Sequence, residues 1–178
     1  MQGTNQKKFH RIILSLPIAL AATLLSQNAM AGTDTSNFAV SATVAASCTV
    51  DASGGLDFGA YDPIVTNANS GSDAEQAGTI NTTCTNGATA TLTLDQGANA
   101  DDGSTDEAPL RRMKDGTDFL DYQLYTDSEH TTVWDNTTGQ SVTGTGASSP
   151  TTVYGVITKG QNVPAGSYTD TVVATITF

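Results

Sequence analysis

The greater part of this sequence predicts an all-β protein folded as a β-sandwich, for three reasons. After a leading segment of 31 residues, the chain of 178 holds 28 Thr and 16 Gly but only 6 Leu. Thr suits half-buried pleated positions and Gly suits turns. No window of 11 residues places apolar side chains at helical spacing. Several short runs alternate apolar and polar residues instead, which is the period of a strand with one buried face.

The leading segment has the three parts of a secretory signal peptide. Basic residues come first: Lys7, Lys8 and Arg11. An apolar run of 14 residues, 12–25, follows, and Ala29-Met30-Ala31 matches a cleavage site. A membrane helix is the alternative, but a helix needs about 20 apolar residues to cross a bilayer. We therefore expect residues 1–31 to direct export and to be removed.

The remaining chain is strongly acidic. It keeps four Lys and Arg against 18 Asp and Glu, a net charge of −14. Nucleic acids and anionic membrane surfaces are bound through clustered basic side chains, so both are excluded as partners. The excess negative charge is expected to keep single copies soluble.

Four longer strands are predicted by alternation, at residues 38–44, 89–94, 120–124 and 171–178. Phe38, Val40, Ala42 and Val44 share one face of the first, and Val172, Ala174, Ile176 and Phe178 share one face of the last. Shorter strands are predicted at residues 56–58, 79–84, 131–134 and 153–157, with loops at 67–72, 97–107 and 137–150. Short strands at this spacing favour a single sandwich domain.

The two cysteines of the exported part, Cys48 and Cys84, predict one disulfide. An even count in an exported chain favours a bond, and this one would close a loop of about 36 residues, worth about 3–4 kcal/mol. No C-x-x-C pair supports a redox or zinc site.

Catalytic and metal motifs are weak, so we expect no enzyme, no metal and no cofactor. A Ser-His-Asp triad would have to use His130, which lies in a polar turn without a nucleophile motif. The acids of the loop 97–107 (Asp101, Asp102, Asp106 and Glu107) resemble a calcium loop only superficially. Their spacing departs from the calcium-binding pattern, so a solvated loop is favoured.

The first predicted strand, 38–44, allows two interpretations. An alternating strand near a free end can fold back into its own sheet, or it can complete the sheet of a neighbouring copy. The alternation is the same in both cases, so the pattern alone leaves both open.

Several segments in order resemble the spore coat protein U family, which includes subunits of archaic, Csu-type chaperone–usher pili. The matching segments are Phe38-Ala-Val-Ser-Ala-Thr-Val44, Cys48-Thr49-Val50, Leu56-Asp-Phe-Gly-Ala-Tyr61, Cys84, Arg112-Met113, Leu120-x-Tyr122-x-Leu124-Tyr125-x-Asp127, Val153-Tyr154-Gly155, Gly160-Gln161 and Gly166-x-Tyr168-x-Asp170-Thr171-Val172. One departure is Trp134-Asp135-Asn136, where relatives often have Gly after Trp, and we expect an altered turn there.

The resemblance implies an incomplete immunoglobulin-like sandwich over residues 45–178, completed by a donor strand from a neighbouring subunit. Residues 32–44 would be the donor segment, with Phe38, Val40, Ala42 and Val44 in the pockets of the acceptor. A periplasmic chaperone would pair near Val172, Ala174, Ile176 and Phe178 until exchange, and an outer-membrane usher would receive the complex.

The function implied is that of a structural subunit of a surface pilus that serves adhesion or biofilm formation. It would be exported through the periplasm of a Gram-negative bacterium. Two alternatives stay open: a spore or cell-coat protein of the same fold, and a self-complete secreted binding module.

Overall fold

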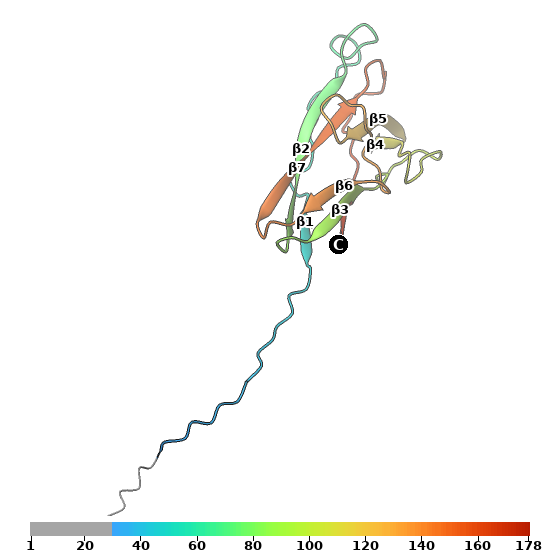
Figure 1. Ribbon diagram of the computed structural model, residues 1–178. Coiled ribbons are helices and arrows are strands. Elements are labelled where there is room, and N and C mark those ends of the chain that lie inside the picture. Colours follow the sequence, from blue (N-terminus) through green and yellow to red (C-terminus); the bar gives the residue numbers. More distant parts are fainter. Residues whose placement is uncertain (1–29) are drawn as a thin grey trace, which may run out of the picture. The chain divides into compact units, whose positions relative to one another are not determined.

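The computed structural model describes residues 30–178, so the predicted signal peptide falls outside the described residues, apart from its last two positions. The chain divides into two units after Ser41, and the second, Ala42–Phe178, is compact. All strands belong to the second unit, and residues 30–47 form none (Figure 1). Within residues 30–178, no helix is long and apolar enough to cross a membrane.

The larger sheet has five antiparallel strands. In spatial order they are β1 (Cys48–Asp51), β2 (Ala74–Cys84), β7 (Ser148–Ile157), β5 (Asp118–Tyr125) and β4 (Arg111–Asp115). The longest ladder joins β2 to β7, from the pair of Ala74 and Ile157 to the pair of Thr83 and Ser148. These two long strands run side by side along the domain (Figure 1).

The smaller sheet has three antiparallel strands, in the order β6 (Gln140–Thr143), β3 (Thr89–Leu94) and β8 (Ala174–Thr177). Its central strand β3 buries Leu92 and Leu94. Strand β5 of the larger sheet buries Leu120, Tyr122 and Leu124 into the same core cluster. The prediction of an all-β chain with alternating buried faces is therefore confirmed.

Several predicted boundaries were wrong, each for a local reason. Residues 56–58 form no strand, Val133 makes only an isolated bridge to Tyr125, and the predicted strand 171–178 is shortened to β8, Ala174–Thr177. Residues 38–44 form no strand with other described residues of this chain, which leaves their pairing with a neighbouring copy a prediction. The predicted loop 137–150 contains β6 and the start of β7. Strand β1 was not predicted because its four residues are too few to show the alternation of a strand. Strand β4 was not predicted because its sequence, Arg-Arg-Met-Lys-Asp, is mostly charged, as suits a strand at the edge of a sheet.

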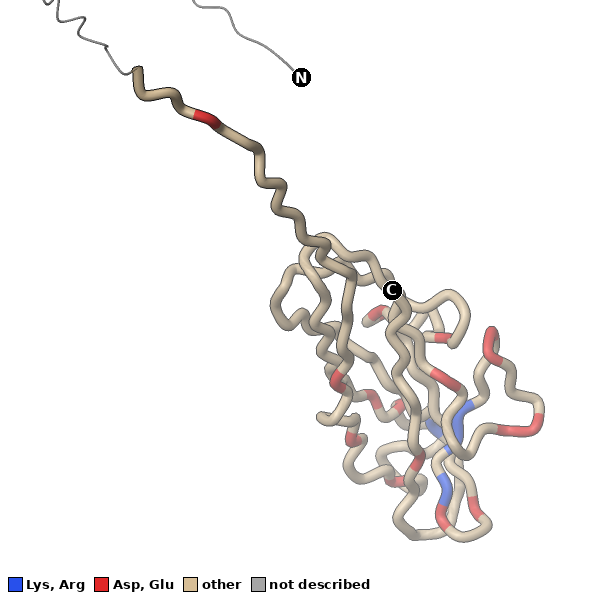
Figure 2. The backbone as a smooth tube through the Cα atoms, turned by 90° about the horizontal axis from the view of Figure 1, so that it is seen from below, with Lys and Arg blue, Asp and Glu red and all other residues tan. Residues whose placement is uncertain are grey.

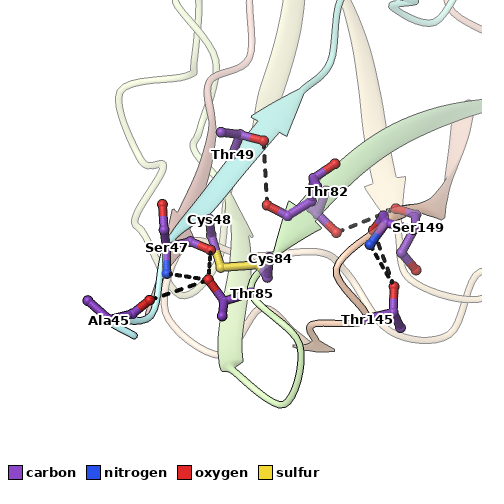
Figure 3. Close-up of a disulfide and its surroundings, with 11 residues drawn as sticks. Ala45, Ser47, Cys48, Thr49, Thr82, Cys84, Thr85, Thr145 and Ser149 are labelled. Atoms are coloured by element: carbon purple, nitrogen blue, oxygen red, sulfur yellow. Dashed lines mark hydrogen bonds between the residues drawn. A yellow bond between two sulfur atoms is a disulfide. The ribbon is translucent and has the colours of Figure 1, made fainter. Parts of the chain in front are cut away.

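The disulfide joins Cys48 and Cys84, as predicted, with an S–S distance of 2.03 Å. The two residues are cross-strand partners at the start of β1 and the end of β2. Just beyond the bond, the Thr85 hydroxyl accepts from the backbone N–H of Ser47 (3.1 Å) and lies 3.5 Å from the carbonyl of Ala45 (Figure 3). The bond and this hydroxyl together fix the point where the N-terminal segment joins the domain.

Arg111, at the start of β4, is a buried cation. Its guanidinium donates to the carbonyls of Asp95 (2.6 Å) and Trp134 (2.8 Å) and to the side-chain oxygen of Gln123 (2.7 Å). Burial lowers the pKa of Arg111, although the reference pKa of arginine is so high that the group stays charged. The buried Trp134 donates to the carbonyl of Leu92 (3.2 Å). These bonds tie the end of β3 to β4 and β5.

We predict that Arg111→Ala lowers the free energy of unfolding by about 3 kcal/mol, because several buried carbonyls lose their donor. Arg112→Ala is the matched control. Its partly exposed guanidinium pairs with Asp101 and donates to two backbone carbonyls, so its removal should cost less, about 1–2 kcal/mol. Urea unfolding followed by tryptophan fluorescence measures both values, and equal losses would show that the buried cation has no special role.

Candidate functional site

A groove of about 1040 Å³ opens into the core of the domain. Packed interiors leave few voids larger than a water molecule, so an opening of this size can hold a ligand or a segment of chain. Its lining is mainly apolar and comes from both sheets. The core residues that line it include Ile80, Leu94, Leu120, Leu124, Val153 and Ile157.

Two strands near the groove, β1 and β8, lie next to each other without a ladder. β1 pairs with β2 and β8 pairs with β3, and no hydrogen-bonded ladder joins β1 to β8 in the described part of the chain. Both strands therefore have one free edge. Unpaired backbone N–H and C=O groups at such an edge are a template for another strand.

Hydrogen-bond parity shows which residues of the last strand carry this free edge. The N–H of Asp95 donates to the carbonyl of Val173 (3.1 Å), so Val173 faces β3. In an antiparallel ladder the alternate residues point their N–H and C=O groups the other way. The free groups therefore belong to Val172, Ala174, Ile176 and Phe178, the residues that the sequence assigned to one face. The first three also pack their side chains against the core.

Two glycines let a crossing segment lie on the wall of the groove. Gly78 of β2 and Gly155 of β7 face Leu56 and Phe58. A Cβ atom at Gly155 would come within 2.8 Å of the Phe58 ring, so these positions have no room for a side chain. The aromatic residue that ends this segment, Tyr61, donates to the carbonyl of Thr158 (3.0 Å) and accepts from the N–H of Gln161 (3.0 Å).

The groove carries a partly buried polar pair. The Tyr122 hydroxyl donates to a carboxylate oxygen of Asp170 (2.7 Å), and the backbone and side-chain amides of Asn99 donate to the other oxygen (3.1 and 3.0 Å). Burial, followed by the bond to Asp170, raises the pKa of Tyr122 well above its usual value. The phenol therefore stays protonated and remains a donor. Gly97 is required here because a side chain would collide with the Asp170 carboxylate.

The N-terminal segment is exposed. Phe38, Val40 and Val44 have 90%, 83% and 82% of their surface accessible, and Ala42 is exposed too. Large apolar side chains in regular alternation are unusual outside a sheet, and they lack a partner face within the described residues.

The family model for the Spore Coat Protein U domain matches residues 34–175. The chain is also 43% identical over 169 residues to "Protein U" of Myxococcus xanthus, an alignment that covers 90% of this chain and 94% of the relative. The chain belongs to the Spore Coat Protein U domain family. The match begins ahead of β1, so it includes the exposed segment 38–44.

A solved structure confirms the fold of this family member. It is the chaperone–tip adhesion subunit pre-assembly complex, CsuC–CsuE, of the archaic chaperone–usher Csu pili of Acinetobacter baumannii. The TM-score is 0.51 at 20% sequence identity, over 76% of this chain. The alignment spans 40% of the matched chain, so it concerns less than half of that protein.

The acidic loop that resembled a calcium site has internal partners instead. Asp101 forms an ion pair with Arg112 (2.7 Å) and accepts from the N–H of Gly103 (3.2 Å). The side chains of Gln96 and Asn136 both donate to Asp106 (3.1 Å each). No group of three or more possible metal ligands occurs among residues 30–178.

His130 also has a local role. It adopts a left-handed backbone with φ of 54°, and its ring packs against those of Tyr125 and Tyr154. Asp127 accepts from the backbone of Thr131 (3.0 Å), which closes the turn around it.

Sequence reasoning missed the wall and polar end of the groove. Gly78 and Gly155 lie in strands whose alternation indicated only a buried face. Arg111 comes two residues after the buried Pro109, but nothing in its neighbourhood distinguishes it from the partly exposed Arg112. Asp170 was quoted for the resemblance, and its bond to Tyr122 depends on contact across 48 positions of sequence.

We predict that Tyr122→Phe destabilises the domain by about 1.5–3 kcal/mol, the usual range for a hydrogen bond to a charged group. Tyr168→Phe is the matched control, because its hydroxyl donates to the exposed carbonyl of Pro164 and its loss should cost about 0.5 kcal/mol. Thermal unfolding of both variants gives the comparison. If the two variants lost the same stability, the polar pair would not support the end of the groove.

Proposed function

We propose that this protein is a structural subunit of a surface filament, in which residues 38–44 of one copy fill the groove of the next. The observation that carries the proposal is the combination of a free β8 edge, an open apolar groove and an exposed alternating segment within one chain. The fold shared with a chaperone-bound pilus subunit supports it.

The chemistry of the two parts is complementary. The groove needs apolar side chains at every second position and backbone groups between them, and the segment offers both. Burying Phe38, Val40 and Val44 would contribute about 5–9 kcal/mol before the cost of ordering the segment. Because each copy donates at one side and accepts at another, the contact is heterologous and extends into a filament.

Export and assembly follow from the same exposed surface. An empty groove leaves apolar groups and an unpaired edge in water, which favours aggregation. A periplasmic chaperone would cover the edge at Val172, Ala174, Ile176 and Phe178, and an outer-membrane usher would exchange it for the next donor. The product would lie on the cell surface and serve adhesion or biofilm formation.

A coat layer is the second candidate, because the matching domain takes its name from a spore coat protein. Immunogold electron microscopy of intact cells separates the two functions. Thin filaments would support the pilus subunit, whereas a continuous layer without filaments would support the coat.

We predict that Val40→Asp and Val44→Asp each prevent assembly, since a carboxylate cannot enter an apolar pocket without a partner. Ser41→Asp and Thr43→Asp are the controls, because their side chains would face away from the groove. An unheated SDS gel reports assembly as a ladder of multimers that collapses on boiling. Ladders from the two Val variants equal to the wild-type ladder would remove the donor assignment.

A second prediction concerns the acceptor. Val172 lines the groove and its neighbour Val173 is exposed. Val172→Asp should therefore abolish the ladder, while Val173→Asp should leave it intact. A monomer band from wild-type protein would instead favour the self-complete binding module, in which residues 38–44 stay within their own domain.

A further inference from the structure

Three pieces of the chain at the end of the domain that carries the disulfide have no charged side chains. Three pieces meet there: residues 45–47, the turn 85–88 and the turn 144–147. The Thr85 hydroxyl holds the first to the second, and the backbone bonds of Gly144 to Gly87 (2.9 Å) and to Ala88 (2.7 Å) hold the second to the third. We call these three pieces the disulfide end. They lie within longer uncharged runs, which are residues 35–50, 80–94 and 136–158.

This neutrality contrasts with the rest of the chain. The sequence has 18 Asp and Glu and a net charge of −11, so two copies generally repel each other. Acidic residues are spread along the domain (Figure 2), whereas residues 45–47, 85–88 and 144–147 include neither acidic nor basic side chains. A surface without acids is where another acidic molecule can approach at least electrostatic cost.

The opposite end presents two apolar side chains. Residues 62–72 form a loop before β2, which we call the loop end, and Ile64 and Val65 in it are 73% and 72% exposed. The Asp62 carboxylate accepts from both of their N–H groups (2.9 and 3.1 Å), and Asn67 donates to the carbonyl of Asp62 (2.7 Å). The loop is therefore fixed, and it holds these side chains in water. Ile64 also borders the groove.

Topology brings these two ends together in a filament. β2 starts at the loop end and reaches the disulfide after 11 residues, so the ends are about 33 Å apart. β3 starts beside the turn 85–88, and β8 is antiparallel to it, so β8 runs from the loop end to the disulfide end (Figure 1). A donor strand antiparallel to β8, the more stable arrangement, leaves the groove at the loop end. Residues 45–47 follow the donor directly.

We propose that successive copies make a second contact in addition to the donor strand, in which Ile64 and Val65 of one copy pack on the disulfide end of the next. This contact rests on the proposed function, and its partner is a second copy of this chain. It is continuous with the groove through Ile64. Its effect is to limit the bending of one subunit against the next.

The test is a cysteine pair across the contact, Val65→Cys with Asn86→Cys, in the full chain. Both positions are exposed, so neither change should disturb folding. Assembled protein is oxidised and then boiled without reductant. We expect covalent multimers that return to monomers with dithiothreitol. The control pair, Glu107→Cys with Asn86→Cys, places the first thiol on the acidic loop and should stay monomeric after boiling.

The outcomes separate the two proposals. An unheated ladder without covalent multimers after oxidation would overturn the second contact and leave donor exchange standing. If wild-type protein gave no ladder of multimers on an unheated gel, donor exchange would be overturned, and the second contact with it.

A charge pair tests the contact without new thiols. Val65→Glu with Asn86→Glu should lower the temperature at which the ladder dissociates at low salt, and Val65→Lys with Asn86→Glu should restore it. Equal dissociation temperatures for the two double variants would contradict the contact.

Discussion

The unpaired edge of β8 constrains the rest of this molecule. Its outward N–H and C=O groups, at Ala174 and Ile176, belong to residues whose side chains pack on the core, so the edge and the open core are one feature. A strand that pairs with this edge would place its own side chains in the groove at the same time. One added strand would therefore pair the free backbone groups and also fill the apolar groove. A small apolar ligand could fill the groove but could not form hydrogen bonds with the backbone groups of the edge.

The remainder of the fold keeps the groove from closing. The long β2–β7 ladder forms a continuous wall, and Leu56 and Phe58 lie on it where Gly78 and Gly155 leave space. On the other side, the guanidinium of Arg111 holds the end of β3 against β4 and β5. The disulfide fixes β1 to β2. These bonds hold the parts of the fold around the groove without spanning it.

The sequence predicted the all-β class, the disulfide and the alternating faces of residues 89–94, 120–124 and 171–178, because each depends on local period or cysteine count. It did not predict β4, whose charged residues pair at an edge, or the polar bond between Tyr122 and Asp170, which depends on distant segments. Residues 38–44 show the limit most clearly. Their alternation is that of a strand, but a strand forms only beside a partner, and this chain by itself supplies none in the described residues.

Hydrogen exchange at the β8 edge tests the central claim most directly. Assembled wild-type protein is compared with the full-length double variant Val40→Asp, Val44→Asp. The account predicts that the edge amides of Ala174 and Ile176 exchange at least about 100-fold more slowly in the assembled protein, as expected when an exposed amide joins a stable ladder. The amides of Thr175 and Thr177, already paired with β3, should change far less. Equal exchange of the edge amides in both proteins would contradict strand donation.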